Sequence, residues 1–226
     1  VWNIIMAISK FNYNSFNVTP VAGKALSFNS DADGFTTQGA SSMVLIKTLT
    51  ASSSATLSFV DGTSSVVLDD TYPVYVFKFI KIHPETDDKH FTFQGNAAGG
   101  SGFNETITST HFRAYQLDNG SGTGGLGYRT ANDQAQATGY QRLTEEQGNA
   151  NSESCSGTLT LFNPSSTTFV KHFIARSFSM MLDSGPRDVF AAGYFNTTSA
   201  IDEISFKFTS GNIDSGTIKL YGIKDS

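Results

Sequence analysis

The chain has 226 residues, a charged fraction of 15% and a formal net charge of −5 at pH 7. Its 19 phenylalanines and 8 tyrosines can bury a sizeable core, which excludes a charge-driven disordered chain. The acidic net charge argues against a nucleic-acid partner. The single cysteine excludes a framework of internal disulfides. The chain has no apolar run long enough for a membrane-spanning helix, which argues against membrane insertion.

The N-terminal part of the chain contains few sustained strand patterns. Val1–Ile5 is apolar, but it is too short for a secretion signal and lacks a basic region, and Met6 is a candidate translation start. We predict that residues 1–40 form an N-terminal arm that serves as a docking segment. Residues 41–226 are predicted to form a single β-sandwich domain with a long loop at 117–156.

From Ser42 onward, hydrophobic residues recur with a period of two, the pattern of strands that bury one face. The predicted strands are Ser42–Leu49, Thr56–Val60, Pro73–His83, Phe91–Phe93, Thr106–Tyr115, Gly157–Phe162, Phe169–Phe178, Phe190–Phe195, Ile204–Phe208 and Thr217–Ile223. Roughly nine to eleven short strands at this spacing predict an all-β fold, an antiparallel β-sandwich of jelly-roll-like form.

Pro73–His83 (PVYVFKFIKIH) is the strongest strand pattern, with apolar residues on both faces and two interrupting lysines. This pattern suits a sheet that is covered mainly on one side and partly on the other. The residues predicted to be mostly buried in two packed sheets are Val76, Phe77, Phe79, Ile80, Phe173, Phe206 and Leu220. The last two strands, Ile204–Phe208 and Thr217–Ile223, are predicted to pair as a hairpin, because glycine-containing turn residues lie between them.

The predicted loop 117–156 is polar and rich in glycine, and loops of this length are usually functional. Gly122–Gly127 matches G-x-G-x-x-G, with Glu145 downstream, but neither a helix nor a parallel strand follows, so a flexible loop is the better interpretation. Tyr128 and Tyr140 are the aromatic residues in this loop that we select as candidate surface or ligand contacts.

We predict no enzymatic activity, no cofactor and no metal site. The four histidines (His83, His90, His111 and His172) are not paired at metal-ligand spacing, and Cys155 has no basic neighbour in sequence that would activate it. Asn29–Gly34 resembles half of a calcium loop, but Ala40 stands where a bidentate Glu is required, which favours a turn. A glycan hydrolase would need two convergent carboxylates, for which the candidates are Asp69, Asp70, Glu85 and Asp88.

Several stretches together resemble a family of small structural proteins of tailed bacteriophages that infect marine cyanobacteria. The stretches are Lys10–Pro20 (KFNYNSFNVTP), Asp33–Thr37 (DGFTT), Val66–Pro84 (VVLDDTYPVYVFKFIKIHP), His111–Gln116 (HFRAYQ), Leu159–Ala175 (LTLFNPSSTTFVKHFIA) and Ala192–Asp225, which contains SGTIKLYGI. The resemblance covers nearly the whole chain from Met6. The resemblance implies that the protein is part of the virion, with a role like that of a tail fibre, and that it carries no catalytic motif.

The resemblance and the composition together predict a non-enzymatic structural protein on the surface of a phage particle. A module of a tail appendage, fibre or baseplate is favoured, because the long glycine-rich loop suits contact with a host surface. Capsid decoration or head fibre, and a carbohydrate-binding module, are the alternatives. The expected partners are other virion proteins, further copies of the chain in a homo-oligomer (a trimer is favoured), and a host cell-surface glycan.

Overall fold

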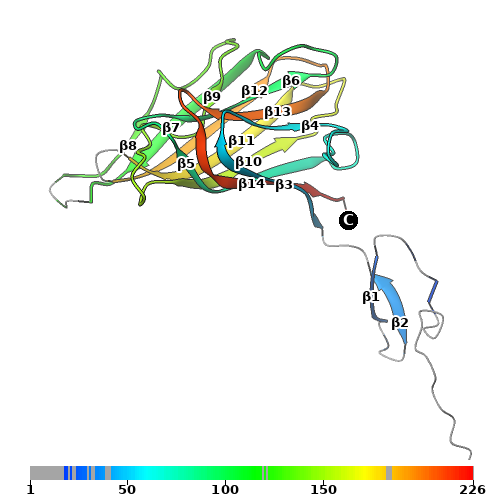
Figure 1. The fold of residues 1–226 in the computed structure, drawn as a ribbon. Coiled ribbons are helices and arrows are strands. Elements are labelled where there is room, and N and C mark those ends of the chain that lie inside the picture. The colour runs from blue at the N-terminus through cyan, green and yellow to red at the C-terminus, as the bar shows by residue number, and fades with distance from the viewer. Residues whose placement is uncertain are drawn as a thin grey trace, which may run out of the picture. The chain divides into compact units, whose positions relative to one another are not determined.

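The computed structural model describes residues 18–19, 21, 24–29, 31, 34–38, 42–118, 120, 122–181 and 185–225. The chain divides into two compact units, Val1–Ser42 and Met43–Ser226. All regular secondary structure of the described residues is β-strand (Figure 1), so the prediction of an all-β fold is confirmed. No helix among these residues is long and apolar enough to cross a membrane.

The N-terminal unit contains a two-stranded antiparallel hairpin of β1 (Ala25–Phe28) and β2 (Phe35–Gln38), which the sequence pattern did not predict. Of the stretch with the calcium-loop letters, the described residues Asn29, Asp31 and Gly34 lie between these strands. Here the Gly34 backbone N–H donates to Asn29 Oδ1 at 3.3 Å. Most of the predicted arm at 1–40 lies outside the described residues.

The second unit consists of two antiparallel sheets that pack on one another, the arrangement of a β-sandwich (Figure 1). The eight-stranded sheet has the order β3 (Met43–Ser54), β14 (Ile213–Ile223), β5 (Val74–Pro84), β10 (Cys155–Phe162), β11 (Lys171–Met180), β12 (Pro186–Phe195), β7 (Ile107–Tyr115) and β8 (Gly125–Tyr128). The four-stranded sheet has the order β4 (Leu57–Val60), β13 (Ile201–Phe208), β6 (Phe91–Ala97) and β9 (Gln141–Arg142). All ten strands predicted between residues 42 and 223 are present, with bounds that differ by a few residues.

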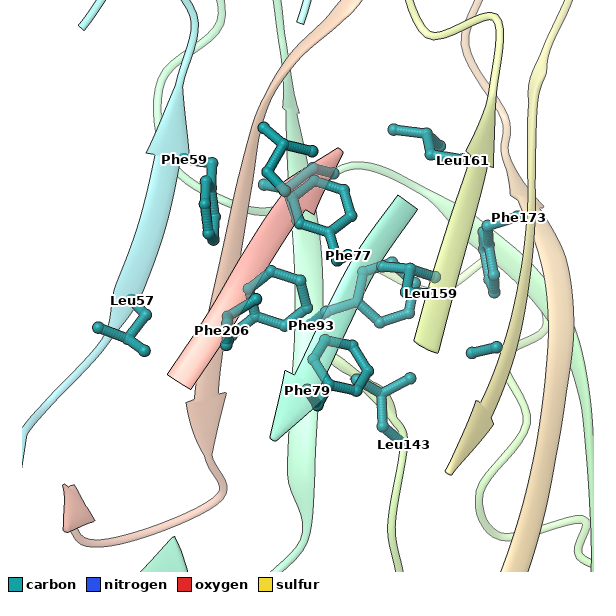
Figure 2. Packing of buried hydrophobic residues seen from close by; sticks show 14 of the residues in the cluster. Leu57, Phe59, Phe77, Phe79, Phe93, Leu143, Leu159, Leu161, Phe173 and Phe206 are labelled. Atoms are coloured by element: carbon teal, nitrogen blue, oxygen red, sulfur yellow. The ribbon is translucent and has the colours of Figure 1, made fainter. Parts of the chain in front are cut away.

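A cluster of phenylalanines fills the space between the two sheets (Figure 2). Phe206 of the four-stranded sheet packs with ring centroids 5.3 Å from both Phe77 and Phe79 of the eight-stranded sheet. These three residues, together with Phe173 and Leu220, are fully buried, as predicted. Large aromatic side chains thus make up a central part of the core between the sheets.

Two of the predicted core residues are placed differently. Ile80 is 40% exposed and Val76 is half-buried, because both point away from the four-stranded sheet. The alternation along β5 changes at Lys81, which has a positive φ of 51° and lies where the register with β10 and β14 shifts. Because of this bulge Ile82 is fully buried in the core, whereas a strict period of two would place it on the same face as Val76 and Ile80.

The predicted hairpin of the last two strands is wrong. β13 pairs with β4 and β6 in the four-stranded sheet, whereas β14 pairs with β3 and β5 in the eight-stranded sheet. The turn between them therefore crosses from one sheet to the other, with Gly211 at a φ of 73°. Alternation indicates that a strand buries one face, but it does not indicate which sheet the strand joins.

The predicted long loop at 117–156 contains two short strands, β8 and β9 (Figure 1). The second half of the glycine motif is β8, which pairs with β7 at the edge of the eight-stranded sheet, so the interpretation as a flexible loop is wrong there. Four side chains after β9 are buried: Leu143, Thr144, Glu145 and Gln147. This part of the segment is packed into the protein and is not a projecting loop.

Candidate functional site

The two tyrosines selected from the sequence do not form one site. Tyr128 lies on β8 of the eight-stranded sheet, is 55% exposed and donates its hydroxyl hydrogen to Asp133 Oδ2 at 2.5 Å. This hydrogen bond raises the pKa of Tyr128 above its ordinary value. Tyr140 lies beneath Lys207 of the four-stranded sheet, whose Nζ is 4.2 Å from the ring centroid. The two rings therefore belong to the surfaces of different sheets.

The four candidate carboxylates do not converge either. Asp69 and Asp70 precede β5, and Glu85 and Asp88 follow it. An 11-residue strand therefore separates the two pairs, which corresponds to roughly 35 Å. Asp69 accepts hydrogen bonds from the Thr71 N–H and the Tyr75 hydroxyl, and Glu85 accepts one from the Asn212 N–H. These are contacts within and between turns.

A group of charges that no sequence pattern indicated surrounds Glu145. The Glu145 side chain is 1% exposed and accepts hydrogen bonds from Arg113 of β7 and from Asn132. Arg129 Nε lies 3.0 Å from Oε1 of Glu145, and Arg187 Nη1 of β12 lies 3.3 Å from Oε2. We call these residues the Glu145 cluster.

The irregular segment 129–147 covers the inner side of β7 and β12. The Glu145 cluster and several hydrogen bonds from β7 hold it there. Backbone that forms no sheet must find other partners when it is buried. Ser109 of β7 donates to Gln141 Oε1 at 2.5 Å and accepts from the Gln134 N–H at 2.9 Å, and Ile107 exchanges backbone hydrogen bonds with Ala137. The arrangement fixes the 129–147 segment on the sheet, which is a structural role.

His111 of β7 lies next to the Glu145 cluster, and neither of its ring nitrogens has a hydrogen-bond partner among the described residues. It is fully buried, and its Nδ1 lies 3.8 Å from Glu145 Oε1. Burial lowers the pKa of His111 to about 4, because the charged imidazolium is disfavoured away from water; the nearby Glu145 carboxylate opposes this shift.

Exposed hydrophobic side chains gather on the outer face of the eight-stranded sheet, the side away from the core. Nine large hydrophobic residues between 43 and 225 are exposed among those that the structure describes, and eight of them lie on strands of this sheet. These eight are Met43, Leu45, Ile80, Phe112, Leu126, Tyr128, Ile174 and Phe178. Exposed large hydrophobic side chains that gather on one face of a protein often mark an interaction site.

One row of directly paired residues crosses this face from β8 to β3. In order, it contains Tyr128, Phe112, Phe190, Arg176, Thr158, Lys78, Lys219 and Thr48. We call it the cross-sheet row. The rings of Phe112 and Phe190 stack with centroids 4.8 Å apart and planes 5° apart, and the Arg176 guanidinium lies 4.8 Å from the Phe190 ring. The row is thus aromatic at one end and cationic at the other.

A shallow hollow of about 310 Å³ opens beside Arg176. Its lining residues are Ser156, Gly157, Thr158, Arg176, Phe178 and Asp188. Arg176 donates two hydrogen bonds to Asp188, Nε to Oδ1 at 3.0 Å and Nη2 to Oδ2 at 2.7 Å. The hollow therefore combines an exposed aromatic ring, a bidentate ion pair and hydroxyl groups, and its volume is at the lower end of the range of small-ligand sites.

Of the remaining sequence candidates, His172 of β11 is exposed on this same face, and none of the others lines the hollow. Cys155 is fully buried in the core, and burial raises the pKa of its thiol. His83 Nδ1 lies 3.3 Å from Asp214 Oδ2, and His90 Nδ1 accepts a hydrogen bond from the Glu146 N–H. Within the described part of the chain, no group of three or more His, Cys, Asp or Glu side chains could hold a metal ion.

Comparisons of the chain with models of protein families, with curated proteins and with solved structures found no match.

Proposed function

We propose that the chain is a non-enzymatic structural protein of a tailed-phage particle, displayed on the virion surface as a module of a tail appendage, fibre or baseplate that contacts the host. The outer face of the eight-stranded sheet is the observation that supports a binding role. This face holds almost all of the exposed large hydrophobic side chains described between residues 43 and 225. A rigid sheet that presents such side chains to solvent is suited to bind a partner.

The resemblance to structural proteins of cyanobacterial tailed phages supplies the virion part of this proposal. The dispersed positions of Asp69, Asp70, Glu85 and Asp88 favour binding over glycan hydrolysis, which needs two carboxylates on opposite sides of one bond. A jelly-roll-like winding belongs to the same proposal. It is supported by the alternation of the chain between the two sheets from β3 to β7 and again from β12 to β14.

The proposal includes a homo-oligomer, most simply a trimer, with the N-terminal segment 1–40 as its docking arm. The 12-residue strand β3 is an edge of the eight-stranded sheet, and an edge strand can pair with a strand of a neighbouring copy. A specific interface of this kind would bury at least about 1,000 Å². Light scattering of the full chain at micromolar concentration is expected to give a mass of three chains. A strict monomer would contradict this part of the proposal.

The location on the particle is tested by mass spectrometry and immunogold electron microscopy of purified virions. We expect the chain in multiple copies at the tail end of the particle. Labelling of the head would favour the first alternative, a capsid decoration or head-fibre protein. Absence of the chain from purified particles would overturn the virion assignment and favour the second alternative, a carbohydrate-binding module.

A further inference from the structure

The cross-sheet row carries charge of the opposite sign to the molecule as a whole. The chain has a net charge of −5, yet the outward side chains in the middle of the eight-stranded sheet include four cationic groups (Lys78, Lys81, Arg176 and Lys219). Two described carboxylates lie on strands of this sheet, and both already have partners: Asp188 pairs with Arg176, and Asp214 lies 3.3 Å from His83. The surface therefore favours an anionic partner.

Two of these cations lie directly opposite one another. Lys78 of β5 and Lys219 of β14 are cross-strand partners, a like-charge arrangement that destabilises a sheet unless an anion compensates it. The ammonium group of Lys78 lies 5.3 Å from the Tyr221 ring centroid. No carboxylate is paired with either lysine in this register, because Thr158 and Thr48 are their other neighbours.

Arg176 is held in a fixed orientation by its neighbours. Arg176 donates hydrogen bonds from Nε and Nη2 to Asp188. Its guanidinium also lies over the Phe190 ring, and the Phe190 ring in turn stacks on the Phe112 ring. A guanidinium has five N–H donors, so three remain for a ligand after the two bonds to Asp188. A donor group that is already oriented loses little entropy when a ligand binds.

Phe178 supplies an apolar surface next to this oriented group. It is 52% exposed, lies two residues from Arg176 on the same face and is paired across the sheet with Asp188 and Ser156. The faces of aromatic rings carry partial negative charge, and the C–H groups on one face of a sugar ring carry partial positive charge, so the two pack favourably. The hydroxyls of Ser156 and Thr158 and the Arg176–Asp188 pair lie around this ring, where they can meet sugar hydroxyls.

We propose that the outer face of the eight-stranded sheet binds an anionic polysaccharide, with one sugar ring on Phe178 in the hollow and its acidic groups along Arg176, Lys78 and Lys219. Because neighbouring strands lie roughly 4.8 Å apart, the row from β8 to β14 extends over roughly 29 Å, which accommodates several sugar units. This inference rests on the proposed binding role and names its ligand class.

A second copy of the chain is a poorer occupant of the same face. A two-fold contact would bring this face against itself, and its described carboxylates, Asp188 and Asp214, are already paired with Arg176 and His83, so the charges of Lys78 and Lys219 would stay uncompensated. An acidic peptide would satisfy the lysines, but it would make no use of the hollow that combines Phe178 with an Arg–Asp pair.

The test measures binding of the full chain to four probes by affinity electrophoresis and isothermal titration calorimetry. The probes are alginate and dextran sulfate as anionic glycans, dextran as a neutral glycan, and poly-L-glutamate as an anion without sugars. We expect binding to at least one anionic glycan that weakens as salt is raised, and no measurable binding to dextran or poly-L-glutamate.

Two variants and two matched controls locate the site. We expect a loss of affinity of at least about tenfold for the double variant Lys78→Gln, Lys219→Gln and for Phe178→Ala. Lys207→Gln, on the four-stranded sheet, and Phe169→Ala, at an exposed position outside the strands, should leave the affinity unchanged.

Three results would overturn the inference: no binding to either anionic glycan, equal binding to poly-L-glutamate, or dimerisation that Phe178→Ala abolishes. The first would leave the virion assignment intact if the chain is present on particles. Conversely, glycan binding by a chain that is absent from particles would support the ligand class and contradict the virion assignment.

Discussion

The guanidinium of Arg113 on β7 donates a hydrogen bond to the carboxylate of Glu145, which is buried in the segment after β9. Arg129 and Arg187 contact the same carboxylate, and Glu146 also pairs with Arg187, so two carboxylates face three guanidinium groups. When one partner of a buried ionic network is removed, the remaining charges lose their compensation, and this loss exceeds the net contribution of the intact network.

Glu145→Gln is therefore expected to lower the free energy of unfolding by about 3–5 kcal/mol. Glu146→Gln is the matched control, because Glu146 is half-exposed and pairs with Arg187 alone, and its loss should stay within about 1 kcal/mol. Urea denaturation followed by circular dichroism measures both. Equal losses for the two variants would show that the Glu145 cluster does not hold the 129–147 segment.

A second prediction concerns stability at acidic pH. Burial lowers the pKa of His111 to about 4 from its ordinary value of 6.5. Between these values the unfolded chain takes up a proton that the folded chain does not, so the free energy of unfolding falls as pH falls from 6.5 to 4, by up to about 1.4 kcal/mol per pH unit. Burial also lowers the pKa of His90, which acts in the same direction.

His111→Gln is expected to flatten this slope, since one of the two histidines with a lowered pKa is then absent. Urea denaturation at pH values from 4 to 8 measures the free energy of unfolding of the variant and the parent protein. Above pH 7 the two curves should run parallel, because His111 is neutral there in both folded and unfolded chains. An unchanged slope between pH 6.5 and 4 would show that His111 does not contribute to the acid sensitivity.

The third prediction compares the core between the two sheets with the outer face of the eight-stranded sheet. Phe206→Ala should lower the free energy of unfolding by about 3–5 kcal/mol, because a buried ring at the centre of the core leaves a cavity (Figure 2). Ile80→Ala should cost less than about 1 kcal/mol, because Ile80 faces outward. Thermal or urea unfolding measures both, and a similar loss at the two positions would contradict the assignment of the faces.

Much of the fold follows from hydrophobic periodicity. The ten strands that were predicted contain long alternating patterns, and their phenylalanines form the observed core. The bulge at Lys81 and the separation of β13 from β14 could not be predicted, because both depend on which strands meet in space. β8 was missed since Gly125–Tyr128 has only two side chains beyond glycine, too few for a period.

The candidate site was less accessible to sequence analysis. Glu145 was noted within a motif, but nothing in its neighbourhood indicated that Arg113 and Arg187, on two other strands, would surround it. The cross-sheet row joins residues from eight strands, and its order depends on pairing register alone. One signal was present in the sequence: the predicted strand Phe169–Phe178 has Ile174, Arg176 and Phe178 at alternate positions opposite the buried Phe173 and Ala175.

The last prediction concerns Gly157, which lines the hollow beside Arg176. A Cβ at this position would lie 2.4 Å from the Arg176 carbonyl oxygen and 2.6 Å from the Ser177 Cα, so the backbones of β10 and β11 would have to separate. We expect Gly157→Ala to lower the free energy of unfolding by about 1–3 kcal/mol, the usual cost of overpacking.

Gly127→Ala is the matched control, because β8 is also a strand and a Cβ there meets no atom within 4 Å. Both variants are compared with the parent protein by urea denaturation and by hydrogen exchange of the β10 and β11 amides. Separation of the strands should accelerate exchange at Leu159 and Ala175 in the Gly157 variant, since these residues are paired next to the substitution. Equal stability of the two variants, with unchanged exchange, would contradict the close approach of β10 to β11 at the hollow.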